Sequence, residues 1–306
     1  MIQLITGENN YEIRARRARL IAEFRQGKTD EAVTIVDGTT TAVDELPQLL
    51  MGASLFAPER LIVIDDAQTQ KAVWEKLAEY LPQVGEGTDV VLAAGSADKR
   101  TKTYKWLQKN AEVVTASNLG EAQLVSWIQN QARDNGFDIA PNIARYLMEY
   151  TAGDQWQLAS DIEKLKLSSQ PVTPELIRDI LIPNPTSSAF DLLDAALSGQ
   201  GKRVNELLDG VRLHEDPYRF FGLLSNQIFA ILLIGAAGSR PPDTIARDSG
   251  LHPFVVKKTT AVARRLSAAQ RKRLAALAAT TDMQLKSSGQ DPWVLVTALL
   301  KSMAAL

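Results

Sequence analysis

The chain has no cysteine among its 306 residues and only two histidines. Without cysteine there can be no disulfide, thiolate metal site, catalytic thiol or cysteine-ligated cluster, and a reducing cytoplasm is the natural setting. His214 and His252 stand at positions typical of turns or caps, and two histidines are too few for most metal or acid–base sites. No serine lies in a G-x-S-x-G pattern. We therefore expect no metal and no nucleophilic triad.

Membrane signals are also missing. The N-terminal Met1–Thr6 has no basic segment before a long apolar run, and Glu8 interrupts it, so no signal peptide is expected. Residues 220–239 carry no charge but include Ser225, Asn226 and Gln227. Since a membrane span needs about 20 mostly apolar residues, we interpret this stretch as a buried bundle helix. We expect no membrane partner and a cytoplasmic location.

A complete phosphate-binding loop is absent as well. A G-x-x-x-x-G-K-[ST] loop that starts at Gly7 would need glycine, lysine and a hydroxyl residue at positions that hold Glu12, Ile13 and Arg14. Without that lysine and hydroxyl, the groups that reach the terminal phosphates and hold magnesium are not assembled. We expect no ATP binding, no hydrolysis and no cofactor.

The first third of the chain alternates strand-like and helix-like segments. Expected strands are 2–6, 33–37, 61–65, 90–94 and 113–115, and expected helices are 11–24, 43–50, 73–81 and 102–108. Alternation of this kind predicts a parallel sheet with helices on both faces. We place the end of this α/β domain near Asn118.

The remainder is predicted to be all-α. Expected helices are 124–135, 143–150, 154–167, 174–180, 190–197, 204–213, 217–236, 242–249, 255–266, 268–283 and 292–304. Pro183-Asn184-Pro185 interrupts them, because two prolines end a helix and favour an extended linker. The fold class is thus α/β plus all-α, with domains at 1–118, 119–184 and 185–306.

Several polar residues of the α/β domain have both a functional and a structural interpretation. Arg14, Arg16, Arg17 and Arg19 could attract phosphate, or form the solvated face of a surface helix. Asp65 and Asp66 follow the strand at 61–65, where a magnesium-organising acid would stand in a nucleotide hydrolase. They could equally end that strand and open a turn.

An apolar pair lies in the short connection before the same strand. Ser54 is followed by Leu55 and Phe56, where polar residues are more usual. Exposed large apolar groups mark contact sites. The alternative, left open by spacing alone, is that the pair packs beneath the sheet as a small satellite core.

Basic residues gather near the C-terminus. Seven of them and no acid lie between Ser249 and Thr281. The segment from Pro242 to Lys258 also has a helix–turn–helix cadence with basic residues after the turn, which keeps a DNA-binding regulator as the alternative function.

Over most of its length the chain resembles the delta subunit of the bacterial DNA polymerase III clamp loader. The segments that carry the resemblance are 4–11, 54–56, 60–67, 98–100, 102–105, 161–165 and 253–258, with Asp282, Lys286, Gly289 and Asp291-Pro292. That family is similar to AAA+ ATPases in fold but has lost nucleotide binding. Gly7, Asp65 and Asp66 would then form a degenerate nucleotide site.

The resemblance implies an AAA+-like domain, a helical lid and a helical collar. It also implies a ring assembled, mainly through the collar, with the ATPase subunits and a second non-hydrolysing subunit. In this family's assembly the ATPase subunits carry an intact phosphate loop and usually a cysteine-ligated zinc, and the second non-hydrolysing subunit typically carries a Ser-Arg-Cys element. This chain has neither the loop nor any cysteine, so it resembles neither of them. The delta subunit of the family grips the sliding clamp, the beta subunit, and holds one interface open for loading onto primed DNA.

The resemblance also assigns residues. The family's principal clamp contact is a Leu–Phe pair, which falls on Leu55 and Phe56 beside Ser54. Candidates for contacts with DNA or neighbouring subunits are Lys99, Arg100, Lys257, Lys258 and Lys286. The sequence departs from the family at Ser287-Ser288, where some members place an aromatic residue close to DNA.

Overall fold

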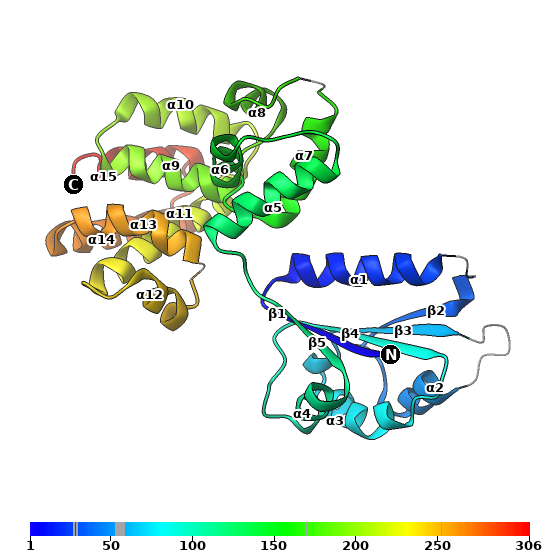
Figure 1. Cartoon of the computed structure of the whole chain (residues 1–306). Coiled ribbons are helices and arrows are strands. Elements are labelled where there is room, and N and C mark those ends of the chain that lie inside the picture. Colours follow the sequence, from blue (N-terminus) through cyan, green and yellow to red (C-terminus); the bar gives the residue numbers. More distant parts are fainter. Residues whose placement is uncertain (27, 29, 53–58, 169, 252) are drawn as a thin grey trace. The chain divides into compact units, whose positions relative to one another are not determined.

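The chain divides into two compact units, Met1–Leu119 and Gly120–Leu306. The computed structural model describes residues 1–26, 28, 30–52, 59–168, 170–251 and 253–306. Figure 1 shows the first unit as a twisted sheet with helices, and the second as helices. The predicted class, α/β plus all-α, is confirmed.

Within the described residues, the first unit contains a five-stranded parallel sheet in the order β2-β3-β4-β1-β5. The strands are β1 (Ile2–Gly7), β2 (Val33–Asp37), β3 (Arg60–Asp65), β4 (Thr88–Ala94) and β5 (Glu112–Ala116). Each was predicted within two residues at either end. Continuous Val- and Ile-rich runs identify these strands, because a central strand of a parallel sheet is buried on both faces.

Alternate residues of the strands point to opposite faces of the sheet and pack into two separate cores. On one face, Ile5 and Val63 pack with Ile13 and Ile21 of helix α1 (Asn10–Arg25). On the other, Leu4 packs among buried residues of α2 (Leu46–Met51), α3 (Lys71–Tyr80) and α4 (Lys102–Asn110). Figure 1 shows α1 on one side of the sheet and these three helices on the other. The side-chain period of two along each strand produces this division.

The second unit is helical throughout its described residues. Its helices are α5 (Glu121–Asp134), α6 (Pro141–Tyr150), α7 (Gln155–Lys166), α8 (Pro174–Ile180), α9 (Pro185–Leu197), α10 (Gly201–Arg212), α11 (Pro217–Ala236), α12 (Pro242–Ser249), α13 (Pro253–Arg265), α14 (Ala268–Ser287) and α15 (Pro292–Met303). They form one compact unit, so a division at residue 184 stays a prediction.

Helix α11 is central to this unit. Among the described residues it is the helix with the length and apolar composition that a membrane span would need. Its buried residues, including Phe220, Leu224 and Ile231, belong to the core that α9, α13, α14 and α15 share. The packing agrees with the interpretation of residues 220–239 as a bundle helix.

Two proline positions differ from expectation. Pro185 does not extend the linker but begins α9, with Asn184 as the N-cap that accepts from the Thr186 amide. Proline suits the first helical turn because its missing N–H would have no partner there. The expected helix 43–50 is split into a 3-10 turn, Val43–Glu45, followed by α2. Pro47, which cannot donate a backbone hydrogen bond, lies where the two meet.

The core of the second unit provides a stability prediction with a matched control on the same helix. Phe220 is fully buried and Phe229 is 58% exposed. We expect Phe220→Ala to lower the free energy of unfolding of this unit by about 3–5 kcal/mol, because it leaves a cavity. Phe229→Ala should change it by no more than about 0.5 kcal/mol. Denaturant titration followed by circular dichroism compares the two, and equal losses would contradict the packing described.

Candidate functional site

The carboxyl ends of the parallel strands bring several predicted residues to one edge of the sheet. Gly7 ends β1 beside Ala116 of β5, and Asp65 ends β3 beside Ala93 of β4. Asp66 follows directly, and its amide donates to the carbonyl of Ala93. We call this the strand-end edge. In open parallel sheets it is where ligands bind.

The connection from β1 to α1 is too short for a phosphate-binding loop. Only Glu8 and Asn9 separate Gly7, the last residue of β1, from the start of α1. Asn9 caps the helix by accepting from the Glu12 amide at 3.1 Å, and it donates to the Ser117 carbonyl at 3.3 Å. Gly7 packs closely on β5, since a Cβ there would stand 2.0 Å from the Ala116 carbonyl oxygen, so the position requires glycine.

Arginines of α1 neutralise the acids at the end of β3. Arg17 Nε donates to Asp65 Oδ1 at 2.7 Å, and both side chains are largely buried, at 17% and 14% exposure. Arg14 lies 3.8 Å from Asp65 and 3.4 Å from Asp66. These pairs occupy the place where a phosphate or a magnesium ion would be bound in a nucleotide hydrolase of this architecture.

Asp66 also has the structural role considered above. It adopts a left-handed conformation with φ of 52°, and its carbonyl accepts from the amide and hydroxyl of Thr69. This opens the 3-10 turn Ala67–Thr69. Aspartate is one of the few residues that tolerate this conformation at low cost.

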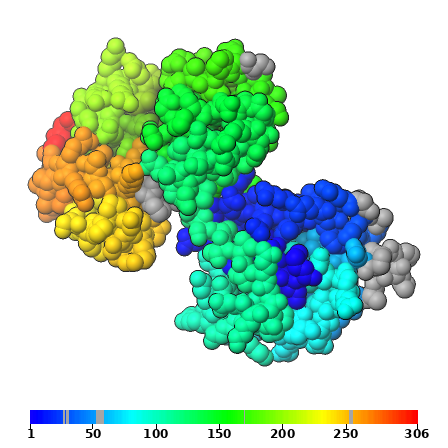
Figure 2. Space-filling view, in the orientation of Figure 1, coloured from blue at the N-terminus to red at the C-terminus, as the bar shows by residue number. Residues whose placement is uncertain are grey.

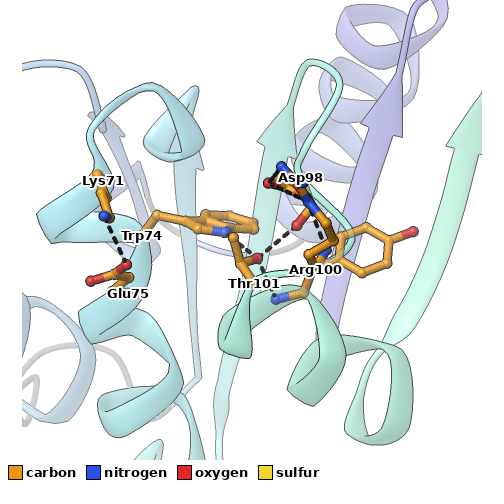
Figure 3. A network of polar contacts seen from close by, with 7 residues as sticks. Lys71, Trp74, Glu75, Asp98, Arg100 and Thr101 are labelled. Carbon is orange, nitrogen blue, oxygen red and sulfur yellow. Dashed lines mark hydrogen bonds and ion pairs between the residues drawn. The ribbon is translucent and has the colours of Figure 1, made fainter.

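The loop after β4 carries Lys99 and Arg100 at the same edge. Arg100 folds back on Asp98, with Nη2 to Oδ2 at 2.8 Å and the backbone amide to Oδ1 at 2.9 Å. Figure 3 shows these two side chains together, with Trp74 donating from its indole to Thr101 next to them. Lys99 is exposed, and among the described residues its side chain forms no hydrogen bond or ion pair.

Ser54, Leu55 and Phe56 lie outside the described residues, but the residues on both sides of them are held firmly. Arg60, at the start of β3, donates to the Leu50 carbonyl at 2.9 Å and to Thr88 at 3.1 Å. Glu59 pairs with Lys28 at 2.6 Å. This segment thus joins the sheet at the amino end of β3, the opposite edge from Asp65.

The C-terminal candidates are engaged within their own unit. Lys257 pairs with Glu121, which also lies 3.6 Å from Arg145. Lys258 lies 3.5 Å from Asp191 and 4.3 Å from the ring centre of Phe190. Lys286 pairs with Asp282 one turn earlier, at 2.7 Å.

Sequence reasoning missed the ion pairs that matter most here. The partners Arg17 and Asp65 are 48 residues apart, and Lys257 and Glu121 are 136 apart. The run of arginines in α1 was the one available signal, and Arg16 joins it by pairing with Glu112 at 3.3 Å. In the described part of the chain, no group of three or more His, Cys, Asp or Glu could hold a metal ion.

Comparison with known proteins agrees with this architecture. A solved structure of the DNA clamp loader delta protein of Bacillus subtilis aligns with a TM-score of 0.76 at 18% identity, covering 100% of this chain and 95% of that one. The fold is therefore AAA+-like, of the clamp-loader type. The curated DNA polymerase III subunit delta of Bacillus subtilis strain 168 is 24% identical over 234 residues, which covers 73% of this chain and 67% of the relative.

Two family models match the chain directly. The model of the DNA polymerase III delta subunit matches residues 4–117, and that of its C-terminal domain matches residues 186–303. The chain belongs to the DNA polymerase III delta subunit family.

The contact between Arg100 and Asp98 predicts how the pKa of Asp98 responds to a mutation. Hydrogen bonds from the Arg100 side chain and amide lower the pKa of Asp98 from 3.8 to about 2. A lowered folded-state pKa means that this contact stabilises the fold above about pH 4 and that the stabilisation is lost as the pH falls towards 2. We expect Arg100→Gln to raise the pKa of Asp98 back towards 3.8.

Lys99→Gln is the matched control, since it removes the same charge from the neighbouring position. Carboxyl carbon chemical shifts followed by NMR during acid titration measure both variants. An unchanged pKa of Asp98 in Arg100→Gln, or an equal shift in Lys99→Gln, would show that the hydrogen bonds are not its cause.

Proposed function

We propose that this chain is the clamp-gripping subunit of a bacterial clamp loader. It binds the ring-shaped sliding clamp, the beta subunit, and opens its ring or holds it open for loading onto primed DNA. It works in the cytoplasm, in one assembly with ATPase subunits and a second non-hydrolysing subunit. The observation that carries the proposal is membership of the delta family at both ends of the chain, together with the Leu55-Phe56 pair.

Leu55 and Phe56 are the proposed anchors, with Ser54 beside them. Burial of each in an apolar pocket of the clamp contributes roughly 1.5–3 kcal/mol, and a few buried anchors commonly dominate an interface. The hydrogen bonds that Arg60 donates to Leu50 and Thr88 support this role. They fix the residues that flank the pair to the sheet, so that less freedom is lost on binding.

Clamp opening needs no nucleotide on this subunit. It needs only that the open ring be bound more tightly than the closed ring, because a binder shifts an equilibrium by its differential affinity. ATP on the neighbouring subunits would control whether Leu55 and Phe56 are accessible. The chain itself would act as a binding module and not as an enzyme.

The loss of nucleotide binding is supported by three features already described. The chain lacks the lysine and hydroxyl of a phosphate loop at Ile13 and Arg14. The connection between β1 and α1 is only two residues long. Asp65 is engaged by Arg17 and Arg14, which would have to be displaced before the carboxylate could organise a metal ion.

We propose the domain division 1–118, 119–184 and 185–306, with the last as the collar that assembles the ring. Lys99, Arg100, Lys257, Lys258 and Lys286 remain proposed contacts to DNA or to neighbouring subunits. The alternative of a helix–turn–helix regulator is less well supported. Lys257 and Lys258, which it would direct at bases, pair with Glu121 and Asp191.

The anchor pair can be tested with the double change Leu55→Ala and Phe56→Ala in the full-length chain. We expect clamp binding to weaken at least a hundredfold, since loss of two buried anchors costs several kcal/mol, about 1.4 for each factor of ten. The melting temperature and assembly with the ATPase subunits should be unchanged. Binding to the clamp of the same organism is measured by surface plasmon resonance.

The control removes the same two residue types from exposed positions elsewhere, with Leu167→Ala and Phe229→Ala. This variant should bind the clamp normally. If the Leu55 and Phe56 variant keeps clamp binding, or if it unfolds, the pair belongs to the core of the domain and the assignment is wrong.

The proposed loss of nucleotide binding gives a separate prediction. Isothermal titration calorimetry of the isolated chain with ATP and magnesium should detect no binding in the micromolar range, because the phosphate-contacting groups are absent. Micromolar affinity, together with ATP turnover that Asp65→Asn abolishes, would overturn it. The ATPase subunit of the same loader is the positive control.

A further inference from the structure

A recess lies within the second unit, where the connection from α8 to α9 meets α10 and the start of α11. It has a volume of about 290 Å³, and its lining includes Tyr150, Ile182, Pro183, Leu207, Gly210, His214 and Glu215. Figure 2 shows the yellow-green surface of α10 next to the green surface of the helices around α8. Sites for drug-sized ligands usually measure about 300–1,000 Å³. The recess therefore suits one large side chain better than a nucleotide or a cofactor.

The walls of the recess are apolar and reach the surface. Ile182 is 57% exposed, and Pro183, Leu207 and Tyr150 are each partly exposed. The Tyr150 hydroxyl donates to the Leu181 carbonyl at 3.0 Å, which fixes the orientation of the ring. Exposed apolar side chains around a recess are typical of a contact site. An occupant should thus have an apolar body.

Glu215 brings a negative charge to this apolar surface. Its side chain is only 11% exposed, and in the part of the chain that the structure describes its Oε2 accepts no hydrogen bond. Arg219 Nη1 lies 3.6 Å from Oε2, too far for a hydrogen bond, and the Arg219 side chain is 70% exposed. A largely buried carboxylate without a donor is costly. A ligand that supplies a donor would remove this cost.

The other charges of the recess are either paired or exposed to water. Arg178 donates to Glu175 at 2.7 Å and to the Tyr146 hydroxyl at 3.1 Å. Glu206 is exposed, with Lys202 at 3.9 Å. The charge that lacks compensation is therefore the negative charge of Glu215, so the recess favours a cation.

Gly210 leaves space at the same place. Glycine inside a helix costs about 0.5–1 kcal/mol relative to alanine, and Gly210 lies within α10. An added Cβ would meet no described atom within 4 Å outside its own stretch of helix, so packing does not require glycine there. A local rule broken without a gain in packing is typical of a functional position.

We propose that this recess binds an arginine side chain presented by a partner protein. The methylene groups of the arginine pack on Ile182 and Leu207. Its guanidinium donates hydrogen bonds to the Glu215 carboxylate and lies against the Tyr150 ring. The absence of a side chain at Gly210 leaves room for it. The proposal goes beyond the clamp contact and does not depend on it.

Other occupants satisfy fewer of these features. A nucleic acid would bring phosphates towards the carboxylates of Glu206 and Glu215. An apolar side chain would cover Glu215 and leave its charge without a partner, which is costly. A lysine is a strongly hydrated point charge, whereas the planar arginine fork matches a carboxylate and also stacks on an aromatic ring.

The probe is a synthetic peptide, acetyl-Ser-Leu-Arg-Leu-Ser-amide, titrated into the full-length chain labelled with ¹⁵N. NMR should show saturable shifts of the amide signals of Ile182, Ser188 and Gly210, which all line the recess. A peptide with citrulline in place of arginine keeps the shape but loses the charge. It should bind at least tenfold more weakly, as expected for the loss of a charge-assisted hydrogen bond.

Two variants test the two features of the recess separately. Glu215→Gln should weaken binding of the arginine peptide at least tenfold, whereas Glu163→Gln, at an exposed position on α7, should not change it. Gly210→Leu should abolish binding by filling the recess, and should not destabilise α10, because leucine forms helix better than glycine. Asn205→Leu is its control, at an exposed position of α10 outside the recess.

Thermal melting followed by circular dichroism shows whether each variant is folded. The proposal is overturned if the peptide causes no saturable shifts, or if the shifted signals lie away from the recess. It is also overturned if the citrulline peptide binds equally well, or if Glu163→Gln weakens binding as much as Glu215→Gln. Should Glu215→Gln fail to fold, Gly210→Leu decides, and binding that survives this change contradicts the proposal.

Discussion

The common direction of the strands is the constraint on which the rest of the first unit depends. Since the described strands all run parallel, every carboxyl end lies at one edge and every amino end at the other. Gly7, Asp65 and the loop of Asp98 are therefore neighbours, although they are far apart in sequence. For the same reason Arg60, the first residue of β3, lies at the opposite edge from Asp65.

The acids at the strand-end edge are paired with arginines of the protein itself. Arg17 and Asp65 are both largely buried, and removing either would leave the other without its partner in a poorly solvated place, which is costly. In a nucleotide-binding relative of this architecture, a ligand would supply such compensation. Here the protein supplies it from α1, through Arg17 and Arg14.

Much of the architecture could be predicted because its signals are local. Helices α8, α11 and α12 have the predicted bounds, and each starts at a proline, two of them after a capping Thr173 or Asp216. Departures from prediction arise where local signals compete, as at Pro47 and Pro185.

The candidate site was harder to predict. Its residues were identifiable one by one, but the pairing of Arg17 with Asp65 depends on how α1 crosses the sheet. Tertiary contacts of this kind are specified by the packing of whole elements, which no short motif records.

The connection between the two units is short and is anchored at both ends. On one side, Asn9 holds the Ser117 carbonyl. On the other, Glu121 is held by Lys257 and Arg145. Between these anchors lie only residues 118 to 120, and since peptide planes are rigid, rotation is confined to a few backbone dihedrals. Each unit thus holds its own end of a three-residue connection by side-chain contacts within that unit.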